Sequence, residues 1–322
     1  MADPRVLRHV IDSITPASAV HAEGARLRVA GAGAALLEQL AARLGGAQHT
    51  ARPRAGKRIV VVCAGDHGVG DPGISLGAAH PTVVAARAIA DGSAALPQVA
   101  RAGRAQVVLV DAGAREPDDM PASAVRLGRA PSRDLMAEPA MTVVDAALAL
   151  EAGIALAVSL ADDGLDVLAV GALGVGSDVA SAALLGAALG APPSGLSDPV
   201  AEAAGERGAA LAGAGGLDLL AAFGGPETGV LAGLLLAAAS TNVPVILDGY
   251  ATGSAALVAS ALSPHVAGYL VAAHTGTFTH PRILAHLGLH PVFDVGLGHG
   301  EGTGAAMIMP LIDQVTALTS RG

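Results

Sequence analysis

The chain has 322 residues, of which 52% are hydrophobic, 15% charged and 2% aromatic, and its formal net charge is −9. An acidic chain with no basic stripe and few rings for stacking argues against a nucleic-acid partner. The longest apolar runs, such as residues 230–239, are shorter than the about 20 residues that cross a bilayer, so no membrane partner is expected. A single cysteine, Cys63, and the lack of a signal peptide at the start predict a cytoplasmic protein.

Residues 1–57 are predicted to form an N-terminal helical segment. Apolar residues recur at helical spacing from Val20 to Leu44, which predicts one or two helices, and a linker is expected at 45–56. The remainder alternates between short β-branched runs and helical stretches, and this alternation predicts an α/β fold with a parallel sheet covered on both faces. The expected strands are 58–64, 106–111, 166–170, 244–248, 267–273 and 291–294.

Most glycine-rich loops of the chain follow an expected strand, so they should gather at one edge of the sheet. Residues 171–176 join a strand to a helix that opens at Ser177, an arrangement that can cradle a phosphate with backbone N–H groups. The alternative is an ordinary glycine turn with Ser177 or Asp178 as helix cap. After the first strand, Asp66 and His67 either line a site or make hydrogen bonds within their loop.

Glu301 lies in the most unusual stretch, residues 294–305, where glycine fills five of twelve positions. Glycine permits positive φ and lets a ligand approach the main chain closely. A helical pattern follows at 305–318, with a kink expected at Pro310. The sequence therefore places Glu301 on a tight loop at a helix N-terminus, facing a ligand-sized space. The alternative is that Glu301 only caps the helix.

Other chemistries find less support in the sequence. Six of the eleven histidines lie from His265 to His299, and His274, His280 and His299 are candidate metal ligands. Their spacing matches no zinc motif. We therefore expect neither a metal nor a cofactor. A serine hydrolase is disfavoured because the Gly-x-Ser-x-Gly pattern at residues 73–77 lies in an expected flexible segment and not at a turn from a strand to a helix. A dehydrogenase is disfavoured because no acidic residue ends a strand at the usual distance after the glycine loop.

Several stretches together resemble the nicotinate-nucleotide–dimethylbenzimidazole phosphoribosyltransferases of cobamide lower-loop assembly. Each stretch is weak alone, but they occur in the order found in that family. They are Ala64–Val69, Glu138–Thr142, Val170–Gly176, Phe223–Glu227, Leu247–Tyr250, the loop at His274, and Gly300–Ala305.

This resemblance implies a homodimer whose subunits have a Rossmann-like catalytic domain, residues 58–304, and a small helical lobe made of residues 1–57 with about 305–322. It implies that ribose phosphate moves from nicotinate mononucleotide to a benzimidazole nitrogen, with Glu301 as the base that takes the azole proton. The residues expected to bind the donor are Gly174, Gly176, Ser177, Asp178, Gly225, Asp248 and Gly276. Those expected to bind the acceptor are Asp66, Ser75, His80 and His299.

The sequence departs from the family's pattern where the donor phosphate would bind. The family's Gly-Glu-Met-Gly-Ile-Gly-Asn-Thr-Thr becomes residues 171–179 here, with Asp178 where a phosphate would rest. Between Asp134 and Pro281 the only lysine or arginine is Arg207. Repulsion between a carboxylate and a phosphate about 4 Å apart makes binding less favourable by about 1 to 4 kcal/mol. Three alternatives stay open: the family's reaction with phosphate held by backbone N–H groups and Arg207, an altered donor or acceptor, and a non-catalytic partner subunit.

Overall fold

A computed structural model describes residues 4–31, 34–71, 73–294, 296–298 and 300–321. Its centre is one seven-stranded sheet with the order β3-β2-β1-β4-β5-β6-β7, in which every neighbouring pair is parallel. The predicted α/β fold with a Rossmann-like parallel sheet is thereby confirmed. The strands are β1 Arg58–Gly65, β2 Gln106–Gly113, β3 Val125–Arg126, β4 Val167–Leu173, β5 Val245–Leu247, β6 Leu270–His274 and β7 Pro291–Phe293.

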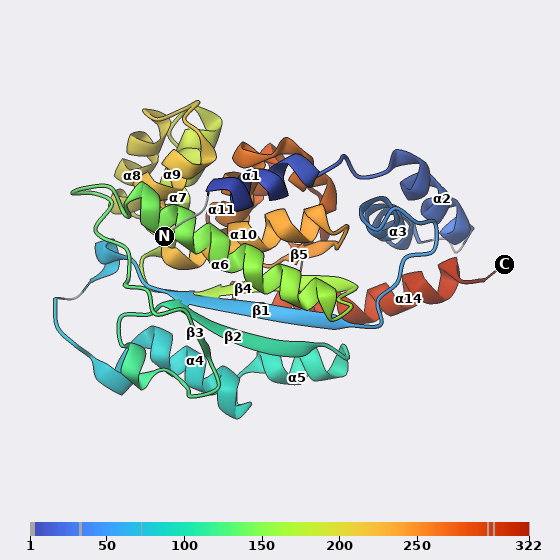
Figure 1. Cartoon of the computed structure of the whole chain (residues 1–322), viewed down its shortest axis with the longest axis horizontal. Coiled ribbons are helices and arrows are strands. Elements are labelled where there is room, and N and C mark those ends of the chain that lie inside the picture. The colour runs from blue at the N-terminus through green and yellow to red at the C-terminus, as the bar shows by residue number, and fades with distance from the viewer. Residues whose placement is uncertain (1–3, 32–33, 72, 295, 299, 322) are drawn as a thin grey trace.

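Helices cover both faces of this sheet, with α4 and α5 on one side and α6 and α10 on the other (Figure 1). The helices before β4 are α1 Pro4–Ser13, α2 Ala19–Val29, α3 Ala35–Ala47, α4 Pro81–Asp91, α5 Ala95–Ala102 and α6 Val143–Asp162. Those after it are α7 Ser177–Leu189, α8 Pro199–Ala209, α9 Gly216–Phe223, α10 Pro226–Ser240, α11 Tyr250–Leu262, α12 His280–His286, α13 Thr303–Met307 and α14 Met309–Thr319.

The alternation of side chains along β1 produces two separate cores. Ile59, Val61 and Cys63 face the core that contains α6 and α10. The intervening Val60 and Val62 face the second core, which contains α3, α5 and α14. Because both faces are buried, β1 is a continuous apolar run, as the sequence predicted.

The structure corrects several element boundaries. The sequence placed α1 only within the broad helical segment 1–57, and no pattern indicated α5 or the two-residue β3. β4 continues to Leu173, so the glycine loop is shorter than predicted. Residues 264–269 form a 3₁₀ helix, so β6 begins only at Leu270. The predicted C-terminal helix is divided at Ile308 into α13 and α14, close to Pro310, because proline cannot donate the backbone bond that would continue α13.

α2, α3 and α14 lie side by side at one end of the molecule (Figure 1). Arg58 at the start of β1 forms an ion pair with Asp313 of α14, which attaches this group to the sheet. α1 lies elsewhere and packs against α6 and α10. The division of the chain into a lobe and a catalytic domain at residue 57 stays a prediction.

α6 is the one helix in the described ranges that is long and apolar enough to cross a membrane, with a mean hydropathy of 1.9 over its best window. One third of that window, 33%, is buried. α6 packs along α10 over the sheet (Figure 1), and a core helix of this composition satisfies the same criterion. Its outer face carries the exposed apolar residues Val143, Val144 and Val158.

Candidate active site

The direction of strand order reverses between β1 and β4, and the loops after these two strands are joined directly there. The Asp66 carboxylate accepts a hydrogen bond from the Val175 N–H at 2.9 Å, and the His67 N–H donates to the Val175 carbonyl at 3.0 Å. A Cβ on Gly174 would lie 1.9 Å from the Gly65 carbonyl oxygen, so only glycine fits. Ligands of open parallel sheets bind at this kind of switch point.

The Glu301 loop, which follows β7, rests on the middle of the sheet. A Cβ on Gly171 of β4 would lie 2.4 Å from the Glu301 carbonyl carbon, so this glycine makes room for the Glu301 peptide. The Ala172 N–H donates to the Gly300 carbonyl at 2.9 Å. Gly302 has φ +98 and directly precedes α13, which turns the chain immediately after Glu301. The tight loop before a helix is therefore as the sequence predicted.

Asp248, directly after β5, holds this loop in place. Its Oδ2 accepts a hydrogen bond from the Gly302 N–H at 2.7 Å, and its Oδ1 accepts one from the Ala305 N–H, also at 2.7 Å. Asp248 is fully buried, and the Nε2 atom of His274 lies 3.3 Å from its Oδ1. The N-terminus of α13 is thus capped by Asp248, and the Glu301 side chain is left for another task.

Glu301 lines a cavity of about 220 Å³ beyond the carboxyl ends of β4 and β5. Its side chain is partly buried, and among the described residues it has no hydrogen-bond or ion-pair partner. No lysine or arginine is part of the lining, which consists of Pro81, Thr82, Ala85, Ala172, Leu173, Gly174, Val175, Ser177, Tyr250, Ala251, Gly298, Gly300 and Glu301. A carboxylate free at the wall of a small, mostly apolar cavity can accept a proton from a bound molecule.

The N-terminus of α7 forms another wall of this cavity. Gly176 takes a left-handed conformation with φ +83 and precedes the helix, and Ser177 Oγ donates to the Gly174 carbonyl at 3.2 Å. Burial raises the pKa of the Tyr250 phenol, the nearby Ser177 side chain lowers it in part, and the negative charge of Asp178 raises it. The Asp178 carboxylate therefore acts on the part of the cavity where Ser177 and Tyr250 meet.

A buried ion pair lies behind the switch point. His67 Nε2 is 3.0 Å from Glu227 Oε1, and Thr228 Oγ1 donates to the same oxygen at 2.6 Å. Burial alone would lower the pKa of His67 and raise that of Glu227, but their mutual attraction reverses both shifts. A Cβ on Gly225 would lie 2.7 Å from the His67 ring, so this glycine admits the pair.

Two of the predicted acceptor residues lie together, since His80 Nδ1 is 3.9 Å from Asp66 Oδ2, but neither of them lines the cavity. The Asp66 carboxylate is committed to the N–H groups of Val175 and Arg115 and to the Thr82 hydroxyl, at 2.9, 2.8 and 2.5 Å. Ser75 is exposed and donates to Glu116 at 2.7 Å. His80 is the buried N-cap of α4 and does not reach the lining, whereas the next residues, Pro81 and Thr82, do. His299 lies outside the described residues.

The predicted donor residues divide into two groups. Gly174 and Ser177 line the cavity, whereas Gly176, Asp178, Gly225, Asp248 and Gly276 surround it or support its loops. At Gly276, φ is +66 and a Cβ would lie 2.6 Å from the His280 ring. His280 is buried, and its ring centroid lies 6.0 Å from that of His274. Burial, together with the charge of His274, lowers the pKa of His280 to about 3. In the described ranges no three His, Cys, Asp or Glu residues form a metal-binding group.

The sequence did not single out Thr82 and Tyr250, which line the cavity, or Glu227, which pairs with His67 behind it. Tyr250 was visible as part of the stretch Leu247–Tyr250, but its expected position in a loop hid that α11 begins with it. The His67–Glu227 contact joins residues 160 positions apart, and no local pattern announces it.

The fold and the site together define a Rossmann-like α/β enzyme that handles a small molecule at the switch point of its sheet. Comparison with known proteins narrows this class. A family model described as "Phosphoribosyltransferase" matches residues 15–321.

Two curated relatives, from Roseiflexus sp. strain RS-1 and Deinococcus radiodurans, are both called nicotinate-nucleotide–dimethylbenzimidazole phosphoribosyltransferase. The first is 38% identical over 85% of this chain and 82% of its own, and the second is 37% identical over 86% and 81%. The crystal structure of the enzyme so named from Thermus thermophilus has a TM-score of 0.82 and 31% identity, and the match covers 95% of this chain and 97% of that one. The chain belongs to this family of phosphoribosyltransferases, which confirms the resemblance found in the sequence.

Proposed function

We propose that this phosphoribosyltransferase moves ribose 5-phosphate from nicotinate mononucleotide to a nitrogen of dimethylbenzimidazole, for the lower ligand of a cobamide. The relatives carry these two substrates in their names. The observation that carries the proposal for this chain is the Glu301 carboxylate, which lines the cavity and has no partner among the described residues. A non-catalytic subunit would have no need of such a group.

The proposed reaction balances around Glu301. The azole nitrogen attacks the anomeric carbon of the donor, and the bond from that carbon to the pyridinium nitrogen breaks. The bonding electron pair returns to the pyridine ring, so nicotinate leaves without acid catalysis. The azole N–H proton passes to the Glu301 carboxylate, which is the general base. Asp248 serves in this scheme as a positioning residue, because its two hydrogen bonds fix the peptide after Glu301.

The N-terminus of α7 is the proposed binding site for the donor phosphate. The N–H groups in the first turn of a helix have no intrahelical partner and favour an anion. Ser177 contributes its hydroxyl, and Gly174 and Gly176 let the ligand approach the main chain. Arg207 is exposed on α8 and does not line the cavity.

A second candidate, a donor without the 5′-phosphate, is favoured by one specific observation. Asp178 stands in the first turn of α7, where its carboxylate would repel a phosphate, and no lysine or arginine lines the cavity to offset it. In this alternative Asp178 accepts a hydrogen bond from a sugar hydroxyl.

Initial rates with dimethylbenzimidazole and either nicotinate mononucleotide or its riboside separate the two donors. We expect the mononucleotide to have the higher kcat/KM, and Asp178→Asn to improve its KM by about fivefold to tenfold, because a repulsion of about 1 kcal/mol or more is removed. If the riboside reacts faster and Asp178→Asn weakens its use, the donor is the nucleoside. If the protein turns over neither donor, the proposed reaction is refuted.

We also propose that the protein is a homodimer located in the cytoplasm. The exposed valines on the outer face of α6 support a second copy as partner. The single cysteine, which is buried in β1 and forms no disulfide, supports the proposed cytoplasmic location.

A further inference from the structure

A second cavity, of about 480 Å³, is larger than the one at Glu301. It opens between the α2–α3 pair and the N-terminal ends of β6 and β7. It shares no lining residue with the cavity at Glu301. Two segments of its wall touch each other, since a Cβ on Gly268 would lie 2.9 Å from the Cβ of Ala17. This volume is in the range of pockets that hold small molecules.

The wall of this cavity is almost entirely apolar. Leu36 and Leu40 of α3, Leu270 of β6, Leu289 and Val292 contribute most of the large side chains. Four polar side chains are part of the lining: Ser18, Gln39, Arg43 and His290. Ser18 is already engaged, since its Oγ lies 2.8 Å from His21 Nδ1. The charged group of the cavity is therefore Arg43.

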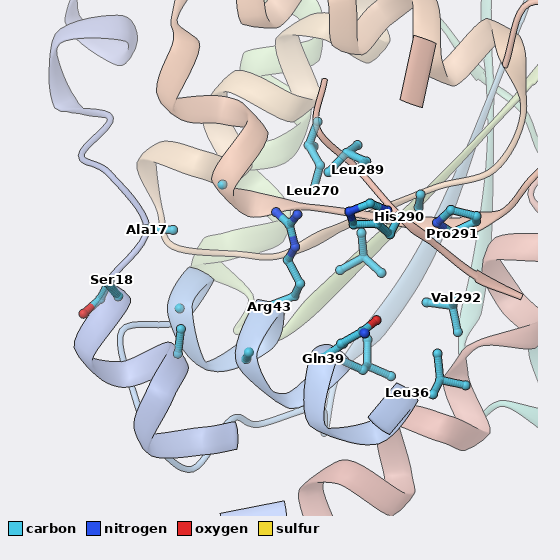
Figure 2. Close-up of a pocket in the computed structure, with 18 residues that line it drawn as sticks. Ala17, Ser18, Leu36, Gln39, Arg43, Leu270, Leu289, His290, Pro291 and Val292 are labelled. Carbon is cyan, nitrogen blue, oxygen red and sulfur yellow. The ribbon is translucent and has the colours of Figure 1, made fainter. Parts of the chain in front are cut away.

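Arg43 is a half-buried cation that no carboxylate neutralises among the described residues. Its Nη1 and Nη2 donate to the carbonyls of Ala267 and Gly288 at 3.5 and 3.2 Å, so two of its five N–H donors are in use. Figure 2 shows its side chain reaching from α3 across the cavity toward Leu270 and Leu289.

Several other arginines of the chain have a different environment. Those at 26, 54, 58, 87, 104, 115 and 133 each form an ion pair with Asp or Glu. Burial lowers the pKa of Arg43, but from so high an ordinary value that the group stays protonated at neutral pH. An unpaired cation in an apolar wall favours a ligand that brings one negative charge.

We propose that this cavity between α3 and the start of β6 and β7 binds a small amphiphilic anion, with its apolar body against the leucines and its carboxylate or phosphate on Arg43. Gln39, one helical turn before Arg43, and His290 at the opening supply further hydrogen bonds to the head group. A neutral molecule of the same shape leaves the Arg43 donors unused and binds more weakly. A polyanion is disfavoured because the lining offers a single permanent cation.

Isothermal titration calorimetry of the full chain with 1-naphthoate tests this site, with 1-naphthamide as the uncharged analogue and 1-naphthyl phosphate to compare head groups. Benzimidazole is present at saturating concentration, so that the cavity at Glu301 does not compete. We expect the naphthoate to bind at least about tenfold more tightly than the amide, as a charge-assisted hydrogen bond implies. Tighter binding of the phosphate would identify a phosphate rather than a carboxylate as the preferred head group.

Four variants locate the binding. Arg43→Met removes the charge but keeps an apolar side chain, and Ala42→Phe fills the cavity from the same helix; both should weaken naphthoate binding at least about tenfold. Arg54→Met is the matched control, because that side chain is 82% exposed and outside the cavity, and it should bind like the unaltered protein. Arg43→Lys keeps the charge and should bind with intermediate affinity.

The proposal is overturned if Arg43→Met and Ala42→Phe bind as well as the unaltered protein, or if the amide binds as tightly as the naphthoate. It is also overturned if the unaltered protein shows no binding, as it would if a second copy of the chain covered the cavity. Circular dichroism melting curves of each variant establish that a loss of binding does not reflect unfolding.

Discussion

At the scale of single residues, Glu301 owes its availability to a division of labour between two carboxylates. Asp248 accepts hydrogen bonds from the N–H groups of Gly302 and Ala305. A glutamate that precedes a helix would otherwise be expected to cap these groups. The sequence left open whether Glu301 is a cap or a base. The structure removes the capping role, because Asp248 is already bonded to both sites.

Replacing Glu301 with Gln keeps the size of the side chain and removes its basicity. We expect kcat for ribose transfer to fall by about 10²- to 10⁴-fold, the usual contribution of a general base, with little change in thermal stability. The control is Asp294→Asn, an exposed carboxylate at the start of the same loop, which should keep full activity. Equal activity of the Glu301→Gln variant and the unaltered enzyme would eliminate Glu301 as the base.

Asp248→Asn tests the positioning role. The amide offers an N–H group where an oxygen accepted a hydrogen bond, so one N–H of the loop loses its buried acceptor. We expect the free energy of unfolding to decrease by about 2 kcal/mol and kcat to fall while KM changes less. Urea unfolding and steady-state rates measure both. In the control Asp162→Asn, whose side chain is exposed at the end of α6, neither quantity should change much. An unchanged kcat in Asp248→Asn would contradict the proposed role.

At the scale of elements, the buried His67–Glu227 pair joins the end of β1 to the first turn of α10. The pKa of His67 is raised above 6.5, so its stabilisation is complete below pH 6.5 and is lost as pH rises through the raised value. The pKa of Glu227 is lowered below 4.5, so its stabilisation is present above pH 4.5 and is lost as pH falls through the lowered value. The pair therefore contributes most between pH 4.5 and 6.5.

Urea unfolding of the unaltered protein and of Glu227→Gln, followed as a function of pH, measures this contribution. Removing one partner of a buried pair should cost about 3 kcal/mol near the middle of that window. The difference between the two proteins should shrink as pH rises through the raised pKa of His67, because the imidazole then becomes neutral in both. A difference that stays constant up to about pH 9, well above the ordinary range of a histidine, would contradict the ion pair.

At the scale of the whole molecule, the outer face of α6 has no partner within the described chain. Val143 and Val144 are 50% and 57% exposed on a helix whose other side packs on α10. Exposed apolar patches of this kind on a folded protein mark interaction surfaces.

We expect light scattering coupled to size-exclusion chromatography to give twice the 31.3 kDa of one chain. The double variant Val144→Asp and Val158→Asp should be monomeric at the same concentration, because burying two carboxylates without partners at the interface is unfavourable. Val20→Asp, which changes an equally apolar residue that is 81% exposed on α2, should remain dimeric. A dimer that survives the α6 substitutions would place the interface on another face.

By itself the sequence determined the α/β class, most strands and the chemical group at Glu301, because these depend on local patterns: β-branched runs, helical spacing and glycines around one carboxylate. It also indicated the family through several short stretches in a fixed order. It placed α1 only within a broad helical segment and gave no sign of the two-residue β3. It also assigned Asp66 and Asp248 to ligands.

Only the tertiary structure decided what those two carboxylates do, because each is held by N–H groups from loops that are distant in sequence: Val175 and Arg115 for Asp66, and Gly302 and Ala305 for Asp248. The same holds for Gly171, which is glycine because the Glu301 peptide lies on it. Residue type limits which hydrogen bonds a side chain can form, but the path of the whole chain determines which partners come within reach. That path leaves Glu301 as the carboxylate that faces the cavity.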